Sequence, residues 1–175
     1  MSAAEIRNSL RSLANNTSIG CDWRAAEHYQ AARKWSSVHR WLALPAAVIA
    51  GATGAAIIAE SKDQALILIA GLAGLLVAAL TAANGVLSPD ERAAQHKKAY
   101  DGFSALRTRF LVFRDCTLLL ERSDEELTQA LTELLNRRDE LAGAVPEPPR
   151  WAQRKVARER KRRSAARLKN DSGGD

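Results

Sequence analysis

Histidine has the broadest chemistry of the side chains in this sequence, and the chain has three: His28, His39 and His96. An imidazole can bind a transition metal or exchange a proton near neutral pH. No carboxylate or cysteine stands near the three in a spacing that would complete a metal site. We therefore predict no metal ligands. We expect the histidines to pack at a seam between helices or to lie near lipid headgroups.

Motifs that carry catalysis are absent from the sequence. It has no glycine-rich phosphate loop, no Cys-x-x-Cys, no His-Glu-x-x-His and no nucleophile elbow. The two cysteines, Cys21 and Cys116, do not suggest a disulfide scaffold or a metal cluster. We predict that the protein is not an enzyme and that it has no catalytic residues and no cofactor.

A strongly basic segment lies near the end of the chain. Residues 150–169 contain ten Lys or Arg and one Glu, a net charge of +9, whereas the whole chain carries +6. Such a segment can bind the phosphates of anionic lipid, of nucleic acid or of a nucleotide-derived signal, or it can be a solvated tail that helps to set topology. Lipid is favoured over nucleic acid because the segment is tethered at a membrane. The candidate contacts are Arg158, Arg160, Lys161, Arg162 and Arg163.

Two apolar runs, residues 41–59 and 65–87, organise the rest of the chain, and the polar residues 60–64 join them. Neither run contains a charge. Helices of 19 and 23 residues are roughly 28 and 34 Å long, enough for a hydrocarbon core of about 30 Å. We predict a two-transmembrane helical hairpin. The alternative is a buried hairpin in a soluble bundle, although a soluble helix of this length normally has a polar face.

Basic residues are more frequent in both flanks of the hairpin than in its loop. Because positively charged flanks stay inside, we expect a multi-pass protein with both termini in the cytoplasm and both cysteines in a reducing compartment. The first 40 residues include a polar, mixed-charge segment, so the first run is not a cleavable signal peptide. The basic residues are Arg24, Arg33, Lys34 and Arg40 before the hairpin, Lys62 in the loop, and Arg92, Lys97 and Lys98 after it.

Small residues recur every four positions on both apolar runs. This spacing lets helix backbones approach closely, and packing drives helix association in lipid. We predict that these residues pack helices together in a homo-oligomer; the alternative is simply an alanine-rich sequence. The predicted packing residues are Ala47, Gly51 and Ala55 on the first run and Ala70, Gly74 and Ala78 on the second.

Three polar side chains interrupt the apolar runs: Thr53, Thr81 and Asn84. In an oligomer they could line a water-filled pore. More often, such residues bond a neighbouring helix or their own backbone. They are therefore candidates for pore-lining residues, and the pore is the less favoured interpretation of these residues alone.

Helical patterns extend the hairpin on both sides. A short helix at residues 3–14 should end in a polar break at residues 15–20, and a second helix should then run towards Arg40. Pro45 should start a fresh helix or kink a long one. Ser88, as the N-cap of a capping box, should begin a helix that ends near residue 121. If the hairpin is antiparallel, partner residues have numbers that sum to roughly 128, and the flanks form a coiled-coil-like stalk. The predicted seam residues are His28, Trp35, His96, Tyr100 and Phe103.

A second capping box, at Ser123, should start a leucine-rich helix that ends near Gly143. The predicted domains are a short N-terminal helix with a linker at 1–19, the hairpin domain at 20–143 and a proline-containing linker with a polybasic tail at 144–175. The expected fold class is an all-α membrane protein. It combines a two-transmembrane hairpin, a cytoplasmic antiparallel helical stalk, a C-terminal helix and a basic tail.

Several of these residues occur in a specific order. A basic, aromatic helix enters the first run through Arg40-Trp41-Leu42-Ala43-Leu44-Pro45. Asn84 ends the second run, and Pro89-Asp90-Glu91-Arg92-Ala93-Ala94-Gln95-His96, Tyr100 and Leu106-Arg107 follow. In this pattern, over residues 20–140, the chain resembles the SLATT family, the SMODS- and SLOG-associating two-transmembrane effector domain. It departs from the family at Val86-Leu87, where aromatic residues are usual, and in its long basic tail.

The resemblance implies a membrane effector of a bacterial conflict or anti-phage defence system, located in the inner (cytoplasmic) membrane. Such proteins are proposed to oligomerise and form a pore or perturb the membrane on a nucleotide or partner signal, causing cell death or dormancy. The implied partners are the lipid bilayer, further copies of the chain and a cytoplasmic sensor or nucleotide-signal partner. The alternative is a non-pore anchor or scaffold that recruits a cytoplasmic partner through its stalk. A soluble bundle that binds nucleic acid is the third and least favoured hypothesis.

Overall fold

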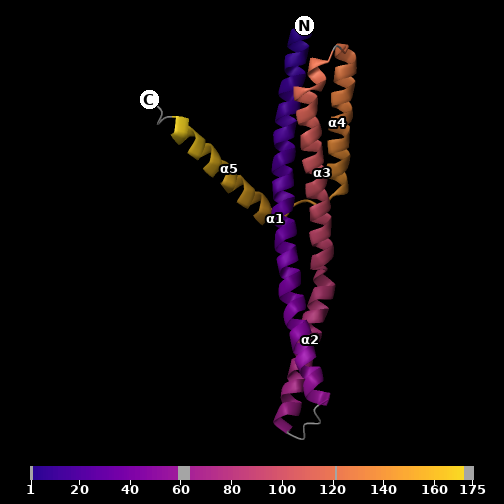
Figure 1. The fold of residues 1–175 in the computed structure, drawn as a ribbon, viewed down its shortest axis with the longest axis vertical. Coiled ribbons are helices and arrows are strands. Elements are labelled where there is room, and N and C mark those ends of the chain that lie inside the picture. The colour runs from indigo at the N-terminus through magenta and orange to yellow at the C-terminus, as the bar shows by residue number, and fades with distance from the viewer. Residues whose placement is uncertain (1, 59–63, 121, 172–175) are drawn as a thin grey trace. The chain divides into compact units, whose positions relative to one another are not determined.

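The computed structural model describes residues 2–58, 64–120 and 122–171, and the side chains of residues 2–51, 64, 65, 68–120 and 122–166. Every element in this part of the chain is helical, as the all-α prediction requires (Figure 1). The helices divide into two compact units: unit 1 is Met1–Ala31 with Gln95–Asp175, and unit 2 is Ala32–Ala94. The helices are α1 (Ala3–Ile58), α2 (Gln64–Leu87), α3 (Pro89–Asp115), the short 3₁₀ helix η1 (Thr117–Leu119), α4 (Asp124–Ala144) and α5 (Arg150–Asp171).

Unit 1 has a hydrophobic core between α1, α3 and α4, which lie side by side in Figure 1. The largest apolar side chains in this core are Phe110 of α3 and Leu127 and Leu131 of α4, all of which are buried. At Gly102, α3 lies so close to α4 that an added Cβ would be 2.9 Å from Cδ2 of Leu141. Packing of this kind supplies most of the stability of helices in a protein.

Helices α1 and α3 pair in unit 1 with the predicted register. Nη1 of Arg114 donates a hydrogen bond to Oδ1 of Asn15 at 2.6 Å. The rings of Tyr29 and Tyr100 have centroids 5.6 Å apart. The residue numbers of each pair, 15 with 114 and 29 with 100, sum to 129. The predicted sum of roughly 128 is therefore confirmed for this unit.

The polar break predicted at residues 15–20 is wrong, because α1 is helical through this stretch. Thr17 and Ser18 are buried there, and Oγ of Ser18 donates to the backbone carbonyl of Asn15 at 2.7 Å. Burial and this bond outweigh the weak helix propensity of these residue types. Helix α1 also continues through Pro45, so no fresh helix begins there.

The chain leaves α2 at Ser88, whose φ of 41° lies in the left-handed region. Its N–H donates to the carbonyl of Asn84, and its hydroxyl donates to the carbonyl of Gly85, both at 3.0 Å. These bonds satisfy the last carbonyls of α2 in the manner of a left-handed C-terminal cap, a position that glycine usually fills. An N-cap has an extended backbone. Ser88 therefore departs from the predicted N-cap conformation, although α3 begins at Pro89 as predicted.

The capping box predicted at Ser123 is confirmed. The Glu126 N–H donates to Oγ of Ser123 at 3.2 Å, and the Ser123 N–H donates to Oε2 of Glu126 at 3.1 Å. The helix that follows, α4, ends at Ala144, one residue beyond the predicted end. The segment predicted as a polybasic tail is helical as well. In this helix, α5, Ala152 and Val156 are buried.

We expect Ser123→Ala to lower the free energy of unfolding by about 1 kcal/mol, because the Glu126 N–H loses its acceptor. Denaturant unfolding of the purified full chain in detergent, followed by circular dichroism, measures this change. Ser164→Ala is the matched control, because the exposed Ser164 hydroxyl bonds only the carbonyl of Arg160 in its own helix. Equal effects of the two substitutions would contradict the capping role.

Candidate functional site

One helical segment among the described residues, Leu68–Leu119, is apolar and long enough to cross a membrane. Its most apolar window has a mean hydropathy of 1.9, and none of that window is buried. The window falls in α2, because α3 carries charged residues along its length. On α2, Leu68, Leu72 and Leu75 are 60 to 69% exposed. The core helix of a soluble protein would bury such side chains.

The first predicted span coincides with the end of α1. Trp41 and Leu44 in this stretch are 77% and 70% exposed. The side chains of residues 52–58 and the whole of residues 59–63 lie outside the described part of the chain. The coarser prediction, an all-helical chain with an apolar helix of membrane length, therefore holds, and the two-span hairpin stays a prediction.

The small residues predicted to pack helices together lie on the surface of unit 2. Ala47, Gly51, Gly74 and Ala78 are exposed, and Ala70 is half-buried. An added Cβ at Gly51 or Gly74 would have no neighbour within 4 Å. The packing of this chain on itself therefore does not require glycine at either position. The side chain of Ala55 lies outside the described residues.

The three candidate pore-lining residues differ in their surroundings. Thr81 is exposed. Oδ1 of Asn84 is buried and has no hydrogen-bond partner among the described residues. A buried amide oxygen without a donor is unfavourable, above all in an apolar environment. The Thr53 side chain lies outside the described residues.

The predicted seam brings His28 and His96 into direct contact in unit 1. Their Nδ1 atoms are 3.0 Å apart, and both residues are buried, at 1% and 5% exposure. The ring of Phe103 stacks on His28, with centroids 5.6 Å apart and an interplanar angle of 17°. A hydrogen bond at this distance needs one Nδ1 that carries a proton and one that does not. Two doubly protonated rings would both donate and would repel each other.

The surroundings of the pair favour neutral rings. Burial, followed by the nearby charges of His96 and Arg24, lowers the pKa of His28 to about 4. Burial also lowers the pKa of His96. Near neutral pH the pair is therefore an uncharged hydrogen-bonded contact between α1 and α3. The pair can accept a proton when the pH falls.

The remaining seam residues pair close to the predicted positions. Tyr100 packs on Tyr29, and within unit 2 the guanidinium of Arg92 lies 4.8 Å from the centre of the Trp35 ring. His39, the third histidine, belongs to unit 2, and its buried Nδ1 has no partner among the described residues. No group of three or more His, Cys, Asp or Glu in the described part of the chain could hold a metal ion.

The five candidate phosphate contacts all lie on α5, and all are exposed. One of them, Arg160, has its guanidinium 5.1 Å from the centre of the Trp23 ring. Nζ of Lys155 donates to Oε1 of Gln30 at 2.9 Å. Ala152 and Val156 of α5 are buried. An anion at the exposed cations of α5 would be bound by charge.

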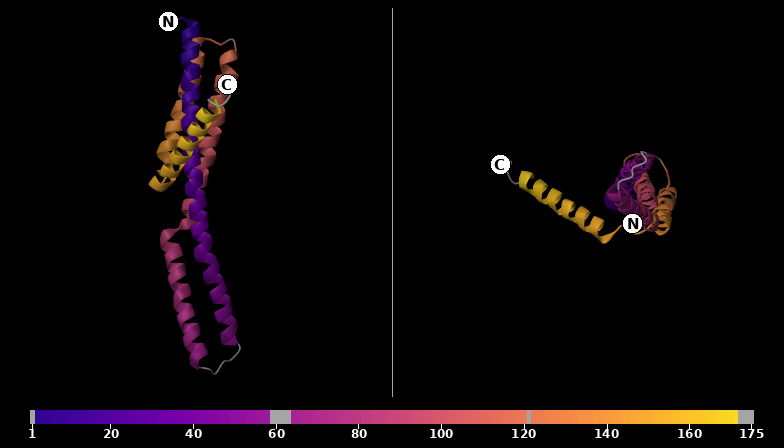
Figure 2. Two further views of the ribbon diagram at one scale, coloured as in Figure 1. Left: turned by 90° about the vertical axis from the view of Figure 1, so that its left-hand side faces the viewer. Right: turned by 90° about the horizontal axis from the view of Figure 1, so that it is seen from below.

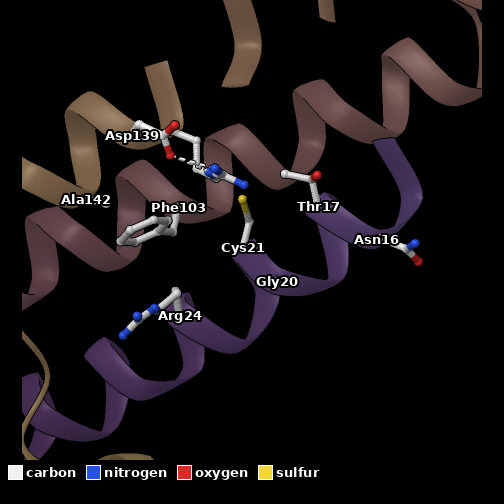
Figure 3. Close-up of a pocket in the computed structure, with 9 residues that line it drawn as sticks. Asn16, Thr17, Gly20, Cys21, Arg24, Phe103, Asp139 and Ala142 are labelled. Carbon is white, nitrogen blue, oxygen red and sulfur yellow. Dashed lines mark hydrogen bonds and ion pairs between the residues drawn. The ribbon is translucent and has the colours of Figure 1, made fainter. Parts of the chain in front are cut away.

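A groove in unit 1 was not predicted from the sequence. It has a volume of about 490 Å³, and α1, α3 and α4 all contribute to it. Figure 3 shows the side chains of Cys21 and Phe103 between the helices, with Arg24 and Asp139 on different helices beside them. No local motif marks such a site, because its residues are far apart in sequence. The lining residues are Asn16, Thr17, Gly20, Cys21, Arg24, Phe103, Arg138, Asp139 and Ala142.

Comparisons of the chain with family models, curated proteins and solved structures give no match. The resemblance to the SLATT family therefore depends on the sequence pattern around residues 40–45 and 84–107. The functional interpretation depends on the chemistry of the residues described above.

We expect the free energy of unfolding to fall as the pH drops from about 6.5 towards 4. The unfolded chain takes up a proton at His28 near the ordinary pKa of 6.5, whereas the folded chain resists it down to about 4. Stability from the neutral ring is thus fully present above pH 6.5 and lost below it, by at most about 3 kcal/mol. Denaturant unfolding at a series of pH values measures the effect.

The matched variants for this prediction are His28→Gln and His39→Gln. The first should flatten the pH dependence between pH 6.5 and 4, because glutamine does not titrate. The second should have the same pH dependence as the wild type, because His39 lies outside the pair. A wild-type profile that coincides with that of His28→Gln would rule out the pair as its source.

Proposed function

We propose that this protein is a membrane effector of a bacterial conflict or anti-phage defence system. In this proposal, residues 41–59 and 65–87 cross the inner membrane as a hairpin, and both termini lie in the cytoplasm. Copies associate through the hairpin, and a signal from a cytoplasmic sensor or a nucleotide leads them to form a pore or perturb the membrane. Cell death or dormancy follows.

The observation that carries the proposal is the exposure of α2. Leu68, Leu72 and Leu75 are 60 to 69% exposed, and none of its apolar window is buried. Monomeric soluble proteins rarely expose apolar patches of this extent. Lipid covers such a helix without further partners. The alternative, a soluble bundle, needs further copies of the chain to cover the same surface.

The small residues of unit 2 support association between copies. The exposed backbone around Gly51 and Gly74 can approach another helix closely, and no contact inside the chain occupies these positions. This observation does not distinguish a pore from a compact oligomer.

The alternative function is a membrane anchor or scaffold that recruits a cytoplasmic partner. This function also requires insertion of the hairpin into the membrane, but the hairpin then serves only to hold the protein there. The exposed cations of α5 favour it, because they offer an anionic partner a binding surface outside the spans. The two functions separate in a leakage assay, because an anchor leaves the membrane intact.

Insertion is tested by Leu72→Arg. An arginine at the centre of a span disfavours insertion by roughly 2.5–3.5 kcal/mol, so we expect this variant to leave the membrane pellet on carbonate extraction. Leu119→Arg is the matched control, since Leu119 is 69% exposed on η1 in unit 1. A wild-type chain that is released by carbonate would refute the membrane proposal.

The effector step is tested by dye leakage from cells after induction together with an active signalling partner. We expect wild-type leakage, and a decrease of at least about tenfold in Gly51→Leu and in Gly74→Leu, because leucine prevents close helix packing. Gly143→Leu is the control, since its Cβ also meets no neighbour and it lies outside the spans. A wild type that is inserted but never leaky would support the anchor instead.

A further inference from the structure

We propose that the C-terminal part of α5 binds double-stranded nucleic acid by lying in its major groove, with basic side chains on the phosphates at both sides. The sequence pattern favoured anionic lipid over nucleic acid for these residues, whereas the arrangement of α5 favours the opposite. The proposal concerns unit 1 alone, to which α5 belongs. It goes beyond the proposed membrane function and does not depend on it.

The first half of α5 is attached to α1. Nζ of Lys155 donates to Oε1 of Gln30 at 2.9 Å, and the guanidinium of Arg160 lies 5.1 Å from the centre of the Trp23 ring. Both partners belong to α1. Val156, which lies between the two contacts in sequence, is buried. These contacts fix the start of α5 on unit 1.

The rest of α5 is exposed to solvent. Residues 160–166 are all exposed, and beyond Val156 no side chain of α5 that the structure describes is buried. The right-hand view of Figure 2 shows the same arrangement, because α5 extends away from the other helices of unit 1. A partner can therefore reach this part of the helix from several sides.

This exposed part of α5 carries a dense positive charge. Residues 158–163 contain five Lys or Arg and one acidic residue, Glu159, so these six residues carry a net charge of +4. Apart from Arg160, which lies on Trp23, these cations form no ion pair with a described residue, so their charge is available to an anionic partner. They are Arg158, Lys161, Arg162 and Arg163.

The cations surround the helix instead of lying on one side of it. Successive residues are about 100° apart around the axis of an α-helix, because a turn takes about 3.6 residues. Lys161 and Arg163 are therefore roughly 200° apart, on opposite sides of α5, with Arg162 between them. A flat bilayer surface meets one side of a helix at a time, so it would not engage Lys161 and Arg163 together.

A nucleic-acid duplex offers phosphates on both sides of a helix. The major groove of B-DNA is about 12 Å wide and admits an α-helix, whose diameter with side chains is about 10–12 Å. The phosphates of the two strands then flank the helix. Lys161 and Arg163 can thus contact phosphates of opposite strands at once, and this favours a duplex over lipid as the partner.

Binding of this kind is driven by charge and is independent of base sequence. Each phosphate that a cation neutralises releases counterions, so the logarithm of the binding constant falls with the logarithm of the salt concentration, by about 0.9 per phosphate. Contacts from the four cations without an ion pair therefore predict a slope of about −3.6.

The test uses the full chain in detergent and a fluorescein-labelled DNA duplex of about 20 base pairs, with binding measured by fluorescence anisotropy between about 50 and 200 mM salt. We expect saturable binding at the lowest salt and the slope given above. Arg162→Gln with Arg163→Gln should weaken binding at least about tenfold and reduce the slope to about −1.8, because two phosphate contacts are lost. Glutamine preserves the helix, because its helix propensity is close to that of arginine.

The matched control is Arg109→Gln with Arg137→Gln, which removes the same charge from α3 and α4. Both arginines are exposed. We expect this variant to bind the duplex as the wild type does. Equal weakening by the two double variants would show that the duplex responds only to overall charge, and this result would overturn the proposal. Absence of binding at the lowest salt would overturn it too.

Nanodiscs separate nucleic acid from lipid as the partner. The chain is placed in discs of zwitterionic phosphatidylcholine or of anionic phosphatidylglycerol, and the duplex is titrated into each. We expect the duplex to bind in both. Binding that is present in phosphatidylcholine and lost in phosphatidylglycerol would assign the cations to lipid and overturn the proposal. The detergent measurement needs no insertion, so a chain that fails to insert would refute the membrane function and leave the duplex titration to decide this proposal.

Discussion

The aliphatic surface of α2 is the main physical constraint on the molecule, because the described chain leaves much of it exposed. Leu68, Ile69, Leu72 and Leu75 are 60 to 69% exposed. Burial of such side chains is worth about 1.5–3 kcal/mol each, so leaving these four in water costs on the order of 5 kcal/mol. A typical domain is stable by only about 5–15 kcal/mol. Insertion into lipid, as proposed above, would cover this surface. The buried histidine pair lies in unit 1.

The sequence predicted best where one local interaction or one periodic constraint decides the outcome. The capping box at Ser123 needs two side chains three residues apart, and it forms. The antiparallel register follows from the centre of the hairpin, and Tyr29 meets Tyr100 as that register requires. The hydropathy of α2 likewise depends on its own residues alone. The prediction of the first span is weaker in the same respect, since the alanines and glycines of residues 41–59 contribute little apolar surface.

The sequence predicted poorly where contacts distant in the chain decide. The polar residues around Thr17 and Ser18 favour a break locally, yet burial against the other helices of unit 1 keeps α1 helical there. The burial of Ala152 and Val156 on α5 was not predicted either, because a basic segment gives no local signal for it. The groove brings together side chains from three helices and has no motif. One of its residues, Arg24, also lowers the pKa of His28, one helical turn away.

The two cysteines have opposite surroundings. Cys21 is 1% exposed, and burial raises the pKa of its thiol, so little reactive thiolate forms at neutral pH. Cys116 is exposed. Cys116 is thus the cysteine in each copy that a thiol-reactive fluorophore or spin label can reach, so no engineered cysteine is needed. Stepwise photobleaching of that label would count the copies in an assembly, and electron spin resonance would measure the distances between them, on the unaltered sequence.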